Sequence, residues 1–104
     1  MNRPHFNNLT PEEDERLSLL LEEMGEVIQI IGKITRHGYE SRHPNGGPTN
    51  RELLETELGH VKFAMGLMYG NNDFSDENVI RSAKEKSRSV IPYLHHQDWI
   101  VGIE

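Results

Sequence analysis

Two capping boxes, Thr10-Pro11-Glu12-Glu13 and Thr49-Asn50-Arg51-Glu52, constrain the fold of this chain more than any other feature. In each box, the threonine and the glutamate three residues later can satisfy amide groups that a helix start leaves unpaired. Apolar residues follow both boxes at alternating steps of three and four residues, and no strand-like alternation competes with them. The sequence therefore predicts an all-α fold with helices that begin after Thr10 and Thr49.

Each predicted helix carries an apolar seam along one face. The seam of the first helix consists of Leu17, Leu20, Met24, Val27, Ile31 and Ile34. The seam of the second helix consists of Leu54, Leu58, Val61, Met65 and Met68. The first helix is expected to end at Gly38 and the second near Gly70. A loop over residues 39–48, rich in proline and glycine, joins them.

A third helix is expected from the cap residue Ser75 to about Val90, just before Pro92. The apolar tail that follows includes Trp99 and Ile100, and we expect it to pack against a neighbouring chain. The predicted fold class is an all-α helical bundle of three main helices per chain, completed by oligomerisation. With 104 residues, the chain is expected to form a single domain over residues 1–104.

The composition excludes several classes of function. The formal net charge of -6 argues against binding to a nucleic acid polymer, because such proteins usually display a basic face. Cysteine is absent, so disulfides, thiolate metal sites and cysteine nucleophiles are excluded. No apolar run approaches the ~18 residues typical of a membrane span, and residues 1–9 lack the apolar core of a signal peptide. A cytoplasmic protein without membrane contact is expected.

Carboxylates interrupt a second stripe on each of the first two helices. On the first helix the stripe is Leu19, Glu23, Glu26, Ile30 and Lys33, and on the second it is Leu53, Glu57, His60, Ala64 and Leu67. The spacings are identical, so facing stripes would bring two pairs of ligand-type side chains together at a helix separation of roughly 8 to 10 Å. Carboxylates so close repel one another, and a cation between them would remove that repulsion. The ordinary alternative is that these are solvated surface side chains.

Four glycines add to the pattern. Gly25 and Gly32 on the first helix, like Gly59 and Gly66 on the second, are seven residues apart. Each costs about 1 kcal/mol of helix propensity relative to alanine. We expect close approach of the two helices to compensate for that cost.

The run Glu22-Glu23-Met24-Gly25-Glu26, followed by Glu57-Leu58-Gly59-His60, resembles the signature of the MazG-like all-α nucleoside triphosphate pyrophosphohydrolases, E-E-x-x-E and then E-x-x-D. The resemblance extends from Leu17 to about Arg88. It implies that Glu23, Glu26, Glu57 and His60 hold metal ions, and that Glu22 and Glu23 act in catalysis, with Glu22 orienting or activating water. It also implies Mg²⁺ or Mn²⁺ as cofactor, cleavage between the α and β phosphates, and homodimers or homotetramers.

His60 departs from the family pattern, which has aspartate at that position. Imidazole is a poor ligand for Mg²⁺ and suits Mn²⁺, Co²⁺ or Zn²⁺ better. Three outcomes remain open: a changed metal preference, fewer metal ions, or nucleotide binding without hydrolysis. A histidine with a purely structural role is the alternative to direct ligation.

Basic residues supply candidates for substrate binding. Lys84 and Arg88 on the third helix resemble the phosphate-contacting residues of the family. Near the end of the first helix, Lys33, Arg36 and His37 suit contacts with a triphosphate or a base, and Tyr39 could stack on a base. The expected substrate is a nucleoside triphosphate, with a deoxynucleotide such as dGTP as the specific guess. Small phage and bacterial members of the family act in nucleotide-pool control.

Two other functions remain open at the sequence level. The E-x-x-H motif at Glu57 and His60 is also used by di-iron and di-manganese carboxylate bundles, and a dimer would supply two copies of it. The chain could instead be a noncatalytic helical dimer that only binds nucleotides. Iron content with oxygen chemistry would favour the first alternative, and binding without turnover would favour the second.

Overall fold

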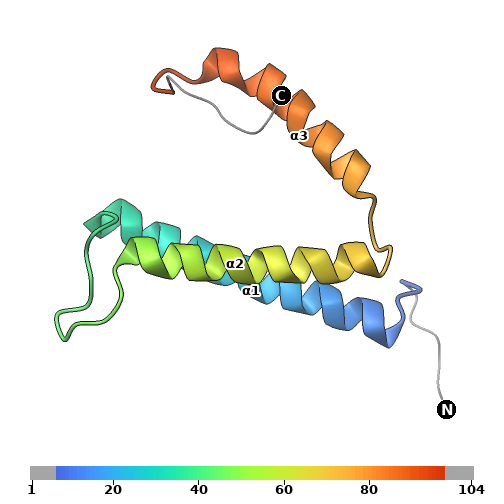
Figure 1. Cartoon of the computed structure of the whole chain (residues 1–104), viewed down its shortest axis with the longest axis horizontal. Coiled ribbons are helices and arrows are strands. Elements are labelled where there is room, and N and C mark those ends of the chain that lie inside the picture. Colours follow the sequence, from blue (N-terminus) through green and yellow to red (C-terminus); the bar gives the residue numbers. More distant parts are fainter. Residues whose placement is uncertain (1–6, 98–104) are drawn as a thin grey trace.

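The computed structural model describes residues 7–97 and contains three helices there (Figure 1). These are α1 (Pro11–His37), α2 (Asn50–Gly70) and α3 (Asp76–Val90), followed by a short 3-10 helix, η1 (Ile91–Tyr93). The predicted all-α class and the three main helices are confirmed. The tail residues Trp99 and Ile100 lie outside the described residues. No helix in residues 7–97 is long and apolar enough to cross a membrane.

The predicted helix starts are confirmed atom by atom. Thr10 Oγ1 accepts from the amide of Glu13 at 3.1 Å, and a Glu13 carboxylate oxygen accepts from the amide of Thr10 at 2.9 Å. Thr49 and Glu52 repeat this reciprocal arrangement at 3.2 and 2.9 Å. At α3, the hydroxyl of Ser75 accepts from the amide of Asn78. These local bonds set the phase of each helix, and therefore the direction in which its functional side chains point.

Helices α1 and α2 pack side by side as an antiparallel hairpin (Figure 1). Few apolar side chains in residues 7–97 are buried: Ile30 on α1, and Ala64 and Met68 on α2. Ile30 and Ala64 belong to the carboxylate-bearing stripes, so those stripes form the contact between the helices. The small core holds the hairpin together around the carboxylates.

Only part of the apolar seam predicted for α1 lies in the contact between α1 and α2. Leu20, Val27 and Ile34 are half-buried at the edge of the interface, whereas its other members face outward. The outward-facing seam residues are Leu17, Met24 and Ile31. Together with Leu21 and Ile28, they form an exposed apolar stripe on α1. Leu21 and Ile28 are 75% and 70% exposed, respectively. The α2 seam is split in the same way, because Met68 is buried while Leu58 is exposed.

The expectation that glycines allow close approach between α1 and α2 is wrong. A Cβ atom added at Gly25, Gly59 or Gly66 would meet no atom within 4 Å beyond its own helical turn. At Gly32, the nearest atom is the Nη1 of Arg36, at an ordinary contact distance of 3.6 Å. The glycines therefore lie outside the hairpin contact, because the angular position of residues 25 and 59 on their helices differs from that of the interface stripes.

Among residues 7–97, helix α3 stands apart from the hairpin and packs mainly with η1 (Figure 1). None of its side chains is buried, and its apolar residues Val79 and Ile80 are exposed. The chain therefore does not form a three-helix bundle by itself. Apolar side chains on both α1 and α3 are left without a partner in residues 7–97.

The long connection between α1 and α2 is fixed at both ends. Gly38 ends α1 with φ +89°, a conformation that glycine adopts without strain, and its carbonyl accepts from the Asn50 side chain at 3.1 Å. The amides of Asn50 and Arg51 donate to the carbonyls of Ser41 and Tyr39, both at 2.9 Å. The loop thus folds back onto the start of α2 and shapes the end of the hairpin.

An ion pair ties the turn after α2 to the beginning of α1. Arg16 donates from Nε and Nη2 to the two carboxylate oxygens of Asp73, at 2.6 and 2.9 Å. Both side chains are largely buried, and the guanidinium lowers the pKa of Asp73 below its usual range. Two parallel bonds of this kind fix geometry as well as charge. They set the direction in which the chain leaves α2.

We expect Asp73→Asn to lower the free energy of unfolding at neutral pH. A carboxylate with a lowered folded-state pKa contributes stability above its ordinary pKa, and this contribution is lost as the pH falls through the folded-state value. The difference between wild type and variant should therefore shrink below pH 4 or so. Urea unfolding at pH 7 and pH 3 measures it, with Glu85→Gln on the exposed face of α3 as control. An equal loss at both pH values would contradict the ionic origin.

Candidate metal centre

Four side chains from two helices converge near the middle of the hairpin. Glu23 and Glu26 come from α1, and Glu57 and His60 come from α2. Each offers one ligand atom, and these four atoms lie within 4.8 Å of one another. The prediction that the two carboxylate stripes face each other is confirmed. The antiparallel packing accounts for it, because both stripes have the same spacing and the capping boxes fix their phase.

His60 links the two acidic helices. Its Nδ1 lies 3.2 Å from Oε2 of Glu23 and 3.3 Å from Oε2 of Glu57. The Glu23 and Glu57 side chains are only 15% and 17% exposed, whereas His60 is 52% exposed. The group is therefore enclosed on the carboxylate side and open to solvent on the imidazole side. A ligand from solvent would reach it past His60.

The carboxylates are under electrostatic strain. The pKa of Glu57 is raised, first by a hydrogen bond with Glu26, then by burial and by the charge of Glu26, while His60 opposes the shift. Two carboxylates held this close repel each other when both are charged. Oε2 of Glu23 is buried and receives no aligned hydrogen bond, although His60 Nδ1 is near. A buried carboxylate oxygen without a donor is costly, and a cation would satisfy it.

The donor set fits a divalent metal ion. Three carboxylates supply hard oxygen ligands, and the imidazole adds a nitrogen that suits Mn²⁺, Co²⁺, Fe²⁺ or Zn²⁺ better than Mg²⁺. A metal ion between the helices would neutralise the repulsion between Glu26 and Glu57 and would bind the buried Oε2 of Glu23, which has no hydrogen-bond donor. A bound cation would therefore remove both unfavourable features, namely the repulsion between the carboxylates and the buried Glu23 oxygen without a donor.

Glu22, the predicted catalytic helper, is not part of this group. It is exposed on α1, next to Glu23 in sequence but on a different face of the helix. Its assistance to a reacting water stays a prediction.

The predicted substrate-binding residues fall into three places. Lys33, Arg36 and His37 line a pocket of about 600 Å³ at the loop end of the hairpin. Tyr39 lies outside that pocket, and one face of its ring carries the guanidinium of Arg51 at 4.4 Å from the ring centroid. Stacking of a base on Tyr39 would require the opposite ring face.

Lys84 and Arg88 are distant in the fold from these groups. They lie on α3, which makes no packing interface with the hairpin. Neither belongs to the carboxylate group or to the pocket at the loop end. Within one chain, these two residues and the carboxylates do not form a single site.

The loop-end pocket also contains residues that the sequence reasoning did not single out, namely Ser41, His43 and Asn50. The density of basic residues on both sides of Gly38 was the available signal. Their meeting depends on how the loop returns to α2, which periodicity does not specify. The sequence therefore predicts that basic residues gather at this end of the hairpin, but it does not predict that they line a pocket.

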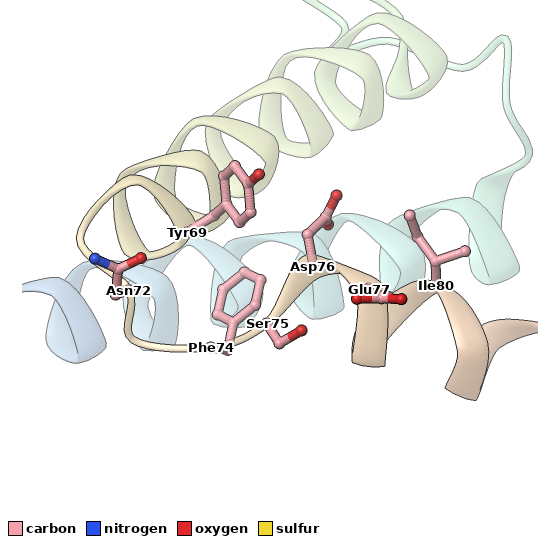
Figure 2. Close-up of a pocket in the computed structure, with 7 residues that line it drawn as sticks. All are labelled: Tyr69, Asn72, Phe74, Ser75, Asp76, Glu77 and Ile80. Atoms are coloured by element: carbon pink, nitrogen blue, oxygen red, sulfur yellow. The ribbon is translucent and has the colours of Figure 1, made fainter.

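A second pocket, of about 750 Å³, lies at the junction of α2 and α3 (Figure 2). Tyr69 and Phe74 form its apolar part, with ring centroids 6.3 Å apart and ring planes tilted by 42°. Asp76 and Glu77 add negative charge at the start of α3. None of the predicted site residues lines it. Its acidic side chains make it unfavourable for phosphate groups.

No protein-family model, curated protein or solved structure matched this chain. Functional assignment therefore depends on the geometry of the carboxylate group and on the sequence resemblance described above.

Proposed function

We propose that the chain is a metal-dependent nucleoside triphosphate pyrophosphohydrolase that cleaves between the α and β phosphates. The products would be a nucleoside monophosphate and pyrophosphate. Purine deoxynucleotides such as dGTP are the proposed substrates, in control of a cytoplasmic nucleotide pool. The observation that carries the proposal is the convergence of Glu23, Glu26, Glu57 and His60 within 4.8 Å, in the order that resembles the MazG-like signature.

The chemistry of the site is consistent with phosphate hydrolysis. A dication bound here would activate water and neutralise charge on the phosphate oxygens. The carboxylates of Glu23, Glu26 and Glu57 hold such a cation from the enclosed side of the group. The half-exposed His60 leaves the opposite side open, where a substrate phosphate would approach. Glu22 is exposed on a neighbouring face of α1, next to Glu23 in sequence, and is proposed to orient water.

A second copy of the chain is proposed to complete the site. The exposed stripe from Leu17 to Ile31 presents apolar side chains at helical spacing, a pattern typical of a surface that packs against another helix. Helix α3, with Lys84 and Arg88, lacks a partner within the described part of its own chain. Packing of α3 against the hairpin of a neighbour would bring these cations to the phosphates. A homodimer or homotetramer would then be the active form.

The proposal is tested with a panel of nucleoside triphosphates, each supplied with Mg²⁺, Mn²⁺ or Co²⁺. Chromatography of the products distinguishes monophosphate plus pyrophosphate from diphosphate plus phosphate. We expect monophosphate and pyrophosphate in equal amounts, with the highest rate for a purine deoxynucleotide. Absence of turnover with every metal and nucleotide would contradict the enzymatic assignment and favour a binding protein.

One contact favours a second candidate function. Glu57 and His60 project into the same group of ligand-type side chains, as the two members of the E-x-x-H motif do in a di-iron or di-manganese carboxylate bundle. That function needs a second E-x-x-H pair from another copy. Iron retained after purification, together with oxygen consumption, would support this candidate over nucleotide hydrolysis.

The variant His60→Asp is expected to shift metal preference from Mn²⁺ or Co²⁺ toward Mg²⁺. The change replaces a nitrogen ligand by the oxygen ligand that Mg²⁺ prefers and restores the family pattern. Changes to residues that only support metal ligands already alter metal affinity by about 10- to 100-fold, so a change of at least that size in the Mg²⁺/Mn²⁺ activity ratio is expected when a ligand itself is exchanged. Metal titrations of the hydrolysis rate measure the ratio. An unchanged ratio would show that the imidazole does not bind the metal.

A further inference from the structure

The pocket at the loop end of the hairpin has an unusual charge for this protein. The chain has a formal net charge of -6, yet Lys33, Arg36 and Arg42 line this pocket and no carboxylate does. His37 and His43 contribute two further imidazoles. At about 600 Å³, the pocket has room for more than a single small ion. Its lining is that of a site for a multiply charged anion.

The cations of the pocket are not neutralised by the described residues. Lys33, Arg36 and Arg42 form no ion pair with a carboxylate in residues 7–97. Arg42 donates only a long bond of 3.4 Å, to the carbonyl of Gly47. The nearby carboxylate of Glu52 is engaged as the helix cap by the amide and hydroxyl of Thr49. The positive charge therefore remains available to a ligand.

The pocket and the carboxylate group lie one after the other along the hairpin, with the pocket nearer the loop between α1 and α2. Lys33 follows Glu26 by seven residues on α1, which corresponds to about 10 Å along the helix axis. On α2, the lining residue Leu53 precedes Glu57 by four residues, or about 6 Å. Long side chains on a helix lean toward its N-terminus, so that of Lys33 leans toward Glu26. A polyphosphate can therefore extend from the carboxylate group into the pocket.

We infer that this basic pocket binds the β- and γ-phosphates of the substrate and holds them as pyrophosphate when it leaves. The inference rests on the proposed hydrolysis and assigns the leaving-group side of that site. Water adds its oxygen to the α phosphorus, and the bond from phosphorus to the α–β bridging oxygen breaks. The bonding pair leaves on that oxygen with pyrophosphate, while the attacking water loses one of its two protons to the surrounding solvent. Lys33, Arg36 and Arg42 stabilise the charge that the pyrophosphate acquires.

The pocket suits phosphates better than a base. Apart from the two imidazoles, it has no aromatic side chain on which a base could stack, because Tyr39 lies outside it beside Arg51. Guanidinium and ammonium groups are the usual partners of phosphate oxygens in proteins. The base is therefore assigned to a different part of the assembled site.

The test measures binding of inorganic pyrophosphate by calorimetry, in the presence of chelator so that no metal is needed. Variants Lys33→Gln and Arg36→Gln, each checked for helicity, should weaken pyrophosphate binding about tenfold or more, since bonds to charged groups contribute about 1.5–3 kcal/mol. Lys62→Gln removes the same charge from an exposed position on α2 outside the pocket and serves as control. Inorganic phosphate, tested in parallel, should bind more weakly than pyrophosphate.

The outcomes separate this inference from the proposed function. Unchanged pyrophosphate binding in both pocket variants, or an equal loss in Lys62→Gln, would overturn the inference even if the protein hydrolyses nucleotides. Pyrophosphate binding that depends on Lys33 and Arg36 in a protein without turnover would contradict the proposed reaction but retain the anion pocket. In an active enzyme, the pocket variants should also raise the inhibition constant of pyrophosphate and leave that of the monophosphate unchanged.

Discussion

Replacing Glu57 with glutamine is expected to reduce nucleotide hydrolysis by about a hundredfold or more, because the change removes a charged ligand from the centre of the carboxylate group. Helicity should be preserved, since glutamine has nearly the same size and shape as glutamate and its amide can still form hydrogen bonds. Mn²⁺ should raise the melting temperature of the wild type and have little effect on the variant. Product assays and thermal unfolding with and without metal measure both effects.

The matched control is Glu55→Gln, which changes the same charge on the exposed side of α2. It should retain full activity and the stabilisation by metal. Full activity of Glu57→Gln would refute the carboxylate group as the reaction centre. A smaller loss is expected for Glu22→Gln than for Glu23→Gln, because only Glu23 belongs to the converging group.

Without metal, the stability of the wild type and that of Glu57→Gln should depend differently on pH. The pKa of Glu57 is raised, so the folded state binds a proton more tightly than the unfolded state. Stability of the metal-free wild type should therefore fall as the pH rises from the ordinary glutamate pKa through the raised one. Glu57→Gln has no titrating carboxyl at this position, so its stability should not show the part of the decline that Glu57 causes. Melting temperatures at pH 5 and pH 8 in chelator provide the measurement.

The variant Ile28→Glu should dissociate the oligomer while leaving the hairpin folded. Ile28 is 70% exposed in the single chain and lies in the middle of the exposed apolar stripe on α1. Burying a charge at the centre of an apolar interface without a partner should raise the dissociation constant by about thirtyfold or more, the range of a strong interface residue. Sedimentation across a concentration series measures the constant, and circular dichroism checks the helices.

The neighbouring substitution Gln29→Glu is the control, because Gln29 is exposed on a different face of α1. It should leave the oligomer intact. Activity should fall together with oligomerisation in Ile28→Glu if Lys84 and Arg88 act on the site of another copy. A wild type that is monomeric at all concentrations, or an Ile28→Glu oligomer of unchanged affinity, would contradict the proposed assembly.

The sequence was informative wherever local chemistry decides the structure. Thr10 and Thr49 predicted both helix starts because a capping box is complete within four residues. The shared spacing of Glu23, Glu26, Glu57 and His60 predicted their convergence, because helices with known phase and a hairpin connection leave few ways to pack. The convergence of these four side chains was therefore predictable residue by residue, whereas their role as metal ligands stays a prediction.

Longer-range features were not predictable in this way. Periodicity describes several neighbouring stripes on α1, and it does not tell which one faces α2. Leu17 and Ile31 were therefore assigned to a seam that is in fact exposed. Gly25 and Gly59 were interpreted from their spacing alone, although their faces point away from the contact. The position of α3 depends on the turn around Asp73, whose pairing with Arg16 spans 57 residues.

The hairpin arrangement also bears on how the protein matures. All four members of the carboxylate group lie on helices that are adjacent in the chain, so their meeting requires only the contacts within the α1–α2 hairpin. Such contacts form quickly, and segments of a nascent chain fold in the order in which they are synthesised. The carboxylates can therefore meet while α3 is still inside the ribosome. The proposed association between finished chains would then be the concentration-dependent last step.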